Sequence, residues 1–144
     1  MERINPISIK DFRDLADKDF RLLDTRETGE FTSGFIPGSL FIGTGMKLED
    51  WAKKLLAPRE PILLIASEDD PVQAFETLSN AGFKIEGFLE GGYKAWEQAG
   101  GKIDLIIDIE ADELALDMPF DPNLTVLDVR RHDEFTEGHL QNAI

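Results

Sequence analysis

The chain of 144 residues contains no cysteine, only two histidines and a single tyrosine. Without cysteine it forms neither disulfides nor thiolate metal sites, and it offers no thiol nucleophile. The histidines, His132 and His139, are too few to supply a zinc site at usable spacing. No apolar run approaches the about 20 residues that span a bilayer, and the N-terminus does not read as a signal peptide. We therefore expect a cytoplasmic protein with no metal of its own.

Acidic side chains outnumber basic ones by 29 to 15, and the formal net charge is −14. Residues 1–104 hold 13 Lys/Arg and 19 Asp/Glu, whereas residues 105–144 hold 2 and 10, so the net charges are −6 and −8. Such a surface repels nucleic acid and anionic membranes, and we expect neither as a partner. Solubility is the favoured explanation of the acidity. The alternative is that the C-terminal part faces something basic.

Short apolar segments alternate with amphipathic ones in the first hundred residues. The apolar run 61–66 is typical of a strand buried on both faces of a parallel sheet. Ser8 can cap a helix over 9–16, and Pro71 can begin another that Gly82 ends. The other expected strands are 21–25, 39–43 and 87–90. A further helix is expected within 46–56, with Leu48, Trp51, Ala52 and Leu55 on one face. A last helix is expected to begin at Gly91 and Gly92. The alternation predicts an α/β layered fold.

An internal repeat links the two ends of the chain. Residues 23–40 align without gaps onto residues 127–144, an offset of 104, with seven of eighteen positions identical. A repeat of this length predicts a duplicated domain, namely a first domain at 1–104 and the N-terminal part of a second at 105–144. The second copy lacks most of its sheet. We expect the chain to be a fragment of a longer protein. Residues 105–144 are then either poorly packed or packed against the first domain or a neighbouring chain, and the second case would give a homo-oligomer through this part.

Two motifs resemble those of a known family. Residues 23–27 read LDTRE and are followed by Glu30-Phe31 and by GFIPGS at 34–39, while residues 89–96 read LEGGYKAW. These motifs resemble the two signatures of rhodanese-like domains, over residues 5–103 and, for the family's first half, again over 107–144. The resemblance implies a three-layer fold whose central, mostly parallel sheet is flanked by helices. The matching family positions are Asp24, Arg26, Gly38, Gly91, Gly92 and Trp96, then Asp128, Arg130 and His139 in the second copy.

Elementary chemistry indicates structural roles for several of these positions. Asp24 and Arg26 end a buried strand, where they can pair and satisfy loop amides. Gly91 and Gly92 allow a tight turn from strand to helix. Trp96 is expected in the core rather than stacked on a ligand.

The loop that carries the chemistry of the family is degenerate here. Rhodaneses read Cys-x-x-Gly-x-Arg after the central strand, with loop amides aimed at an anionic sulfur. Here the position of the cysteine is taken by Ile65 or Ala66. The loop continues with Ser67, Glu68, Asp69, Asp70 and Pro71. The three acids repel sulfur anions, and Pro71 removes an amide. Ser67 has no base in sequence reach, and a solvated acidic loop is favoured over a Mg or Ca site. We therefore expect no catalytic residue and no metal ligand.

Residues 35–43 read FIPGSLFIG, and LEGG at 89–92 leads to GKID at 101–104. Together with the loop that lacks cysteine, these segments resemble, more narrowly, the rhodanese pair that follows a metallo-β-lactamase-fold domain in proteins of persulfide and sulfide oxidation. This resemblance implies that the parent is an enzyme with zinc or iron in a separate domain, and that the partners of this chain are other domains of that polypeptide. The favoured hypothesis is a catalytically inactive rhodanese-homology module with a structural or regulatory role in sulfur metabolism. One alternative is a standalone binding module whose acidic loop recognises a basic partner or a cation. Another is an enzyme that works through carboxylates.

Overall fold

The computed structural model describes residues 4–43, 46–67 and 71–144. Its internal contacts divide the chain into two compact units, Met1–Ile107 and Asp108–Ile144. The first unit extends past residue 104 because Phe35 and Asp104 form an antiparallel bridge, with N···O distances of 2.8 and 2.9 Å. The N–H of Ile106 also donates to the carbonyl oxygen of Thr32. That the second unit begins a duplicated domain stays a prediction.

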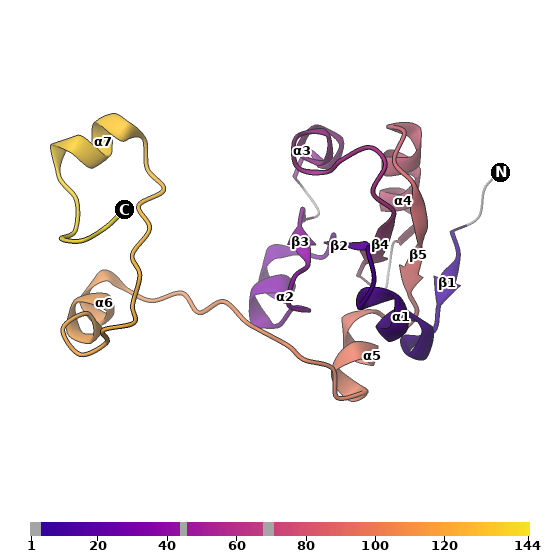
Figure 1. The fold of residues 1–144 in the computed structure, drawn as a ribbon, viewed down its shortest axis with the longest axis horizontal. Coiled ribbons are helices and arrows are strands. Elements are labelled where there is room, and N and C mark those ends of the chain that lie inside the picture. Colours follow the sequence, from indigo (N-terminus) through magenta and orange to yellow (C-terminus); the bar gives the residue numbers. More distant parts are fainter. Residues whose placement is uncertain (1–3, 44–45, 68–70) are drawn as a thin grey trace. The chain divides into compact units, whose positions relative to one another are not determined.

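Parallel strands form the centre of the first unit (Figure 1). The order in the sheet is β1-β5-β4-β2-β3. The strands are β1 (Pro6–Ile7), β2 (Arg21–Asp24), β3 (Leu40–Phe41), β4 (Ile62–Ile65) and β5 (Ile85–Leu89). The four expected strands are therefore present. The two-residue β1, which pairs with Phe88 and Leu89 of β5, was not predicted because it is too short to show a pattern.

Strand β4 lies in the middle of the sheet, and its four residues are all buried. Ile62 and Leu64 belong to one apolar cluster, whereas Leu63 and Ile65 belong to another. Successive side chains of a strand point to opposite faces, so both faces of the sheet are covered. The expected burial of this strand on both faces is confirmed, as is the α/β fold class.

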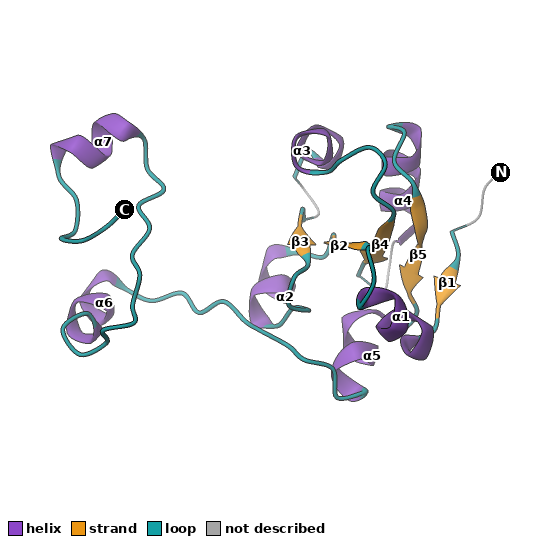
Figure 2. Cartoon of the chain, in the orientation of Figure 1, coloured by secondary structure: helices purple, strands orange, loops and turns teal. Residues whose placement is uncertain are grey.

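Helices cover the sheet on both sides, as Figure 2 shows. They are α1 (Ile9–Ala16), α2 (Thr28–Ser33), α3 (Leu48–Leu55), α4 (Pro71–Asn80) and α5 (Gly92–Gln98). Ala52 of α3 and Phe75 of α4 pack in the cluster that contains Ile62. Phe12 of α1 and Trp96 of α5 pack in the cluster on the other face, which contains Leu63. The Ser8 hydroxyl accepts the N–H of Asp11, so the predicted cap of α1 is confirmed.

The predicted buried face of α3 is confirmed at Leu48 and Ala52 but is wrong at Trp51 and Leu55. Ala52 is buried and Leu56, just past the helix, packs beside it, whereas Trp51 and Leu55 are exposed. Ala52 and Leu56 belong to the cluster that contains Leu64, whereas the side chain of Trp51 lies towards solvent. The ring of Trp51 there contacts the ammonium of Lys54, 5.3 Å from the ring centre.

The second unit consists of α6 (Ala111–Asp117), α7 (His132–Glu137) and extended segments. All of residues 108–144 are described, and none of them is buried. The N–H of Asp128 donates to the carbonyl oxygen of Ile144 at 2.8 Å, and the N–H of Ile144 donates to the carbonyl oxygen of Val126 at 3.0 Å. This is the bonding pattern of a parallel ladder with Leu127 opposite Ile144. Across the described parts of the chain, no helix is long and apolar enough to cross a membrane.

Candidate functional site

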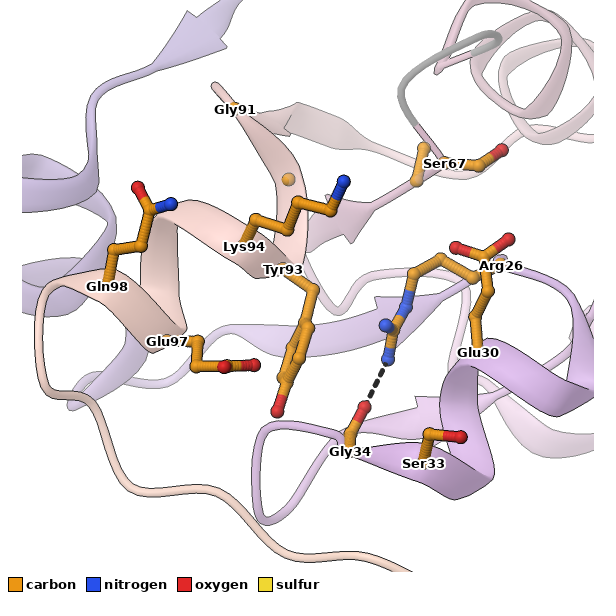
Figure 3. Close-up of a pocket in the computed structure, with 12 residues that line it drawn as sticks. Arg26, Glu30, Ser33, Gly34, Ser67, Gly91, Tyr93, Lys94, Glu97 and Gln98 are labelled. Atoms are coloured by element: carbon orange, nitrogen blue, oxygen red, sulfur yellow. Dashed lines mark hydrogen bonds between the residues drawn. The ribbon is translucent and has the colours of Figure 1, made fainter.

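A pocket of about 570 Å³ opens at the carboxyl edge of the sheet in the first unit (Figure 3). The carboxyl ends of parallel strands meet at one edge, and open α/β sheets bind ligands there. The loops after β2, β4 and β5 bring to this edge residues that lie far apart in the sequence. The pocket is lined by Arg26, Glu30, Ser33, Gly34, Ala66, Ser67, Gly91, Gly92, Tyr93, Lys94, Glu97 and Gln98.

The inner wall of the pocket is built by a buried ion pair. The Arg26 Nη2 atom lies 2.8 Å from Asp24 Oδ2, and Nε donates to both carboxylate oxygens at 3.0 Å. The backbone N–H of Arg26 donates to Oδ1 as well, and Nη2 donates to the Gly34 carbonyl at 2.7 Å. Asp24 is 0% exposed and Arg26 is 4% exposed. The expected pairing is present, and the guanidinium is held by partners from its own domain.

Tyr93 stands against this arginine. The guanidinium carbon of Arg26 lies 4.4 Å from the centre of the Tyr93 ring, and Figure 3 shows the ring facing Arg26. The Tyr93 hydroxyl is buried without a hydrogen-bond partner among the described residues. Burial, and then the nearby Glu97 carboxylate, raise the pKa of Tyr93 above 10, so the phenol stays neutral. A side chain at Gly34 would collide with this hydroxyl, so glycine there leaves room for the ring.

Tyr93 was not among the site residues predicted from the sequence, and neither were Ser33, Lys94, Glu97 and Gln98, which also line the pocket. A usable signal was present, because Tyr93 directly follows the glycine pair at the turn from β5 to α5 and therefore lies in the first turn of a helix at the carboxyl edge. Its contact with Arg26, however, joins residues 67 positions apart. No local pattern contains such a contact.

The glycines and the tryptophan of the family motif shape the chain around the pocket. Gly91 and Gly92 have φ values of 79° and 65°, a region that glycine reaches without strain. They turn the chain from β5 into α5, beside the Ala66 carbonyl. Gly38 has a φ of 86° in the turn before β3. Trp96 is buried, as predicted; its ring meets Phe12 edge to face, and its Nε1 donates to the Lys102 carbonyl at 2.7 Å.

The loop after β4 begins with Ala66, which is 6% exposed, and Ser67, both of which line the pocket. Glu68, Asp69 and Asp70 lie outside the described residues, so the expectation of a solvated acidic loop stays a prediction. Among the described residues that line the pocket with Ser67, there is no histidine. In the described ranges, no group of three or more His, Cys, Asp or Glu side chains could hold a metal ion.

The second unit repeats the ion-pair motif at the offset of 104. Arg130 Nη2 lies 2.7 Å from Asp128 Oδ2 and donates to the Gly138 carbonyl at 2.8 Å, as Arg26 does to Gly34. The backbone N–H of Arg130 donates to Asp128 Oδ1 at 3.1 Å. His139 stacks on Phe135, with ring centres 3.9 Å apart. The same local geometry therefore occurs twice, once buried and once exposed.

We expect the Asp128 carboxyl to titrate with a pKa of about 2, because hydrogen bonds from the side chain and backbone of Arg130 lower it from 3.8. A carboxylate with a depressed pKa stabilises the folded state above its ordinary pKa. The stabilisation of this motif is thus present above pH 3.8 and is lost as the pH falls towards about 2. A ¹³C NMR titration measures the pKa, and Arg130→Gln should return it towards 3.8. An equally low value in that variant would contradict the assignment.

The first unit is an α/β domain whose parallel sheet has helices on both faces. Its pocket is framed by a buried Asp-Arg pair and by a Gly-Gly turn. The rhodanese-like domain family matches residues 8–99. The chain therefore belongs to the rhodanese-like domain family, and the resemblance read from its motifs is confirmed.

Solved structures show the same fold. The Alr3790 protein from Anabaena sp. is 24% identical, with a TM-score of 0.63 over 78% of this chain and 93% of that one. A rhodanese-related protein from Thermoplasma volcanium is 26% identical, with a TM-score of 0.56 over 69% and 97%. The thiosulfate sulfurtransferase from Pseudomonas aeruginosa is 19% identical, with a TM-score of 0.59; the match covers 97% of this chain but 33% of the enzyme. A comparison with curated proteins found no match.

Proposed function

We propose that this chain is a catalytically inactive rhodanese module with a structural or regulatory role in a larger protein of sulfur metabolism. The observation that carries the proposal is Ala66. This residue directly follows the central strand and lines the pocket. It is one of the two positions, with Ile65, to which the resemblance assigns the cysteine of the family motif. In sulfur transfer a thiolate attacks the outer sulfur of a donor such as thiosulfate, so that a persulfide forms and sulfite leaves. A methyl group cannot take the place of the thiolate.

The charges around the pocket also support inactivity. The guanidinium of Arg26 is paired with Asp24 and donates to the Gly34 carbonyl, so little of its positive charge is left to attract an anion. The carboxylates of Glu30 and Glu97 line the pocket and oppose an anionic donor. Lys94 is a lining cation that already has an interaction of its own. The pocket therefore differs from an anion-binding site in charge as well as in the missing nucleophile.

We expect no thiocyanate from thiosulfate and cyanide above the level of a heat-inactivated sample. The thiosulfate sulfurtransferase of Pseudomonas aeruginosa serves as the positive control. Ala66→Cys should stay equally inactive, because the Arg26 charge remains compensated and the carboxylates remain. Turnover by the unmodified chain would overturn the proposed inactivity. Turnover by Ala66→Cys alone would show that the missing thiol is the only defect, against our account of the charges.

The proposed role within a larger protein has a separate test. The narrower resemblance implies a parent with a metallo-β-lactamase-fold domain upstream and zinc or iron in that domain. Mass spectrometry of the native polypeptide measures its length, and its terminal sequences reveal any further motifs. A mass well above 16.2 kDa with His/Asp metal-ligand motifs upstream is the expected result. A native mass of 16.2 kDa would contradict the larger parent and leave the inactivity untouched.

A further inference from the structure

Helix α3 presents two large apolar side chains to solvent. Ala52 and Leu56 pack in the core cluster beneath the helix. Trp51, in contrast, is 42% exposed and Leu55 is 47% exposed. These two residues are four positions apart, so their side chains adjoin on the surface of the helix. Isolated exposed apolar residues need no explanation, whereas adjoining ones that include a tryptophan are typical of binding surfaces. We call this pair the Trp51 stripe.

The Trp51 stripe belongs to the first domain itself. Helix α3 lies within residues 8–99, which match the rhodanese-like domain family. It packs with α4 on one side of a sheet that has an apolar cluster on each face (Figure 1). None of the described residues that line the pocket belongs to α3. The stripe is therefore a surface of a domain with its own core, and it is separate from the pocket.

The local charge around the stripe is opposite to the charge of the rest of the chain. Residues 46–59 hold four Lys/Arg and two Asp/Glu, whereas all other residues together hold 11 and 27. Lys47 lies four positions before Trp51, and Lys54 lies three positions after it, the spacings at which side chains adjoin on a helix. The ammonium of Lys54 lies 5.3 Å from the centre of the Trp51 ring. Two lysines therefore flank the stripe.

The acidic residues of α3 compensate these two lysines only in part. The carboxylate of Glu49 is paired with Lys53, with Oε1 at 2.8 Å from Nζ. Asp50 lies four positions before Lys54 and offsets part of its charge. Among the described residues, no carboxylate lies within ion-pair distance of Lys47 or Lys54. Positive charge thus remains beside the apolar side chains.

We propose that the Trp51 stripe is a docking surface for a segment of another protein in which Asp or Glu residues flank an apolar side chain. Burial of the Trp51 ring and of Leu55 against that side chain supplies the hydrophobic part of the affinity, and tryptophan is enriched among the residues that dominate binding energies. Carboxylates of the partner pair with Lys47 and Lys54, which orients the segment and speeds its association.

The acidic remainder of the chain makes this docking selective. Its 27 Asp and Glu side chains repel an acidic segment elsewhere on the surface, so that charge restricts the segment to α3. A membrane of anionic lipids fits less well, because so large a surface would meet those acids as well. The proposal does not depend on whether the pocket of the first unit is catalytic.

Selection of peptides on the immobilised full chain tests the chemistry of the partner. The probe is a library of random short peptides displayed on phage, and we expect the selected peptides to combine Leu, Phe or Trp with several Asp or Glu. The most frequent sequence is then synthesised and titrated into the ¹⁵N-labelled chain. The chain has two indole N–H groups, and that of Trp96 donates to the Lys102 carbonyl. We therefore expect the peptide to shift the indole signal of Trp51 and to leave that of Trp96 in place.

Two variants separate the apolar from the charged part of the surface. Trp51→Ala should weaken peptide binding at least about tenfold, as for a central interface residue. Lys47→Glu combined with Lys54→Glu should weaken it as well, and added salt should reduce the difference from the unmodified chain. The matched control is Lys10→Glu combined with Lys18→Glu, which makes the same change in net charge at exposed positions outside α3. This control should bind the peptide as the unmodified chain does, since charges beyond a Debye length are screened.

Several outcomes would overturn the proposal. Selection of no peptide, or of peptides without Asp and Glu, would contradict the acidic partner. Equal binding by Trp51→Ala would place the peptide elsewhere on the chain. Binding to vesicles of phosphatidylcholine and phosphatidylserine that Trp51→Ala abolishes would assign the stripe to a membrane. A dimer in sedimentation that Trp51→Ala dissociates would assign it to a second copy, and a Trp51 signal that the peptide leaves unshifted in the native polypeptide would show that the stripe is covered within its own chain.

Discussion

Replacing Asp24 with alanine should lower the free energy of unfolding of the first unit by about 3–5 kcal/mol. Asp24 is 0% exposed, and its carboxylate accepts hydrogen bonds from the side chain and the backbone of Arg26. Removing one member of a buried ion pair leaves the other as an uncompensated charge in the interior. Denaturant unfolding followed by tryptophan fluorescence measures the change, because both tryptophans, Trp51 and Trp96, lie in this unit.

The repeat supplies the control for this substitution. Asp128→Ala removes the same carboxylate from the same local geometry, but its partner Arg130 is exposed. Water can solvate the arginine that is left behind, so we expect no measurable change in the unfolding of the first unit. Equal losses for the two variants would show that burial does not decide the strength of this motif. A loss below about 1 kcal/mol for Asp24→Ala would mean that water reaches Arg26.

Replacing Leu23 with alanine should cost the first unit about 2–5 kcal/mol, the range for a leucine deleted from a packed core. Leu23 is 0% exposed and belongs to the cluster with Ile42, Leu64 and Leu78. The matched change, Leu127→Ala, removes the equivalent side chain of the second unit, which is 66% exposed. It should change the unfolding free energy by no more than about 0.5 kcal/mol. Denaturant midpoints at constant slope test both values, and comparable losses would contradict the burial assigned to the two leucines.

The sequence predicted most of the fold because its elements carry strong local signals. The apolar run around β4 has few alternatives to a central strand, and Ser8 and Pro71 begin their helices where capping chemistry places them. The errors occur where the signal is not local. Strand β1 is only two residues long, and it exists because Asn5 and Ile7 can approach β5 at Gly87, where a side chain would collide with them.

The site was predicted less completely than the fold. The pairing of Asp24 with Arg26 was expected because the residues are two positions apart at a strand end. The contact of the Tyr93 ring with Arg26 was not expected, because it depends on how α5 packs against the end of β2. On the predicted face of α3, Trp51 and Leu55 were misassigned for a similar reason. Helical periodicity marks Trp51 as a candidate for burial, but the side chains that reach the core cluster are those of Ala52 and of Leu56, just past the helix.

The Asp-Arg-Gly motif adopts one geometry in both units, although only the first surrounds it with a core. Its hydrogen bonds join residues no more than eight positions apart, from Arg26 to Gly34 and from Arg130 to Gly138. Contacts so close in sequence cost little loop-closure entropy and form on the fastest timescales of chain collapse. The motif is therefore suited to act early in folding. It would fix the direction of the chain between β2 and β3 before β4, whose contacts are more distant in sequence, completes the sheet.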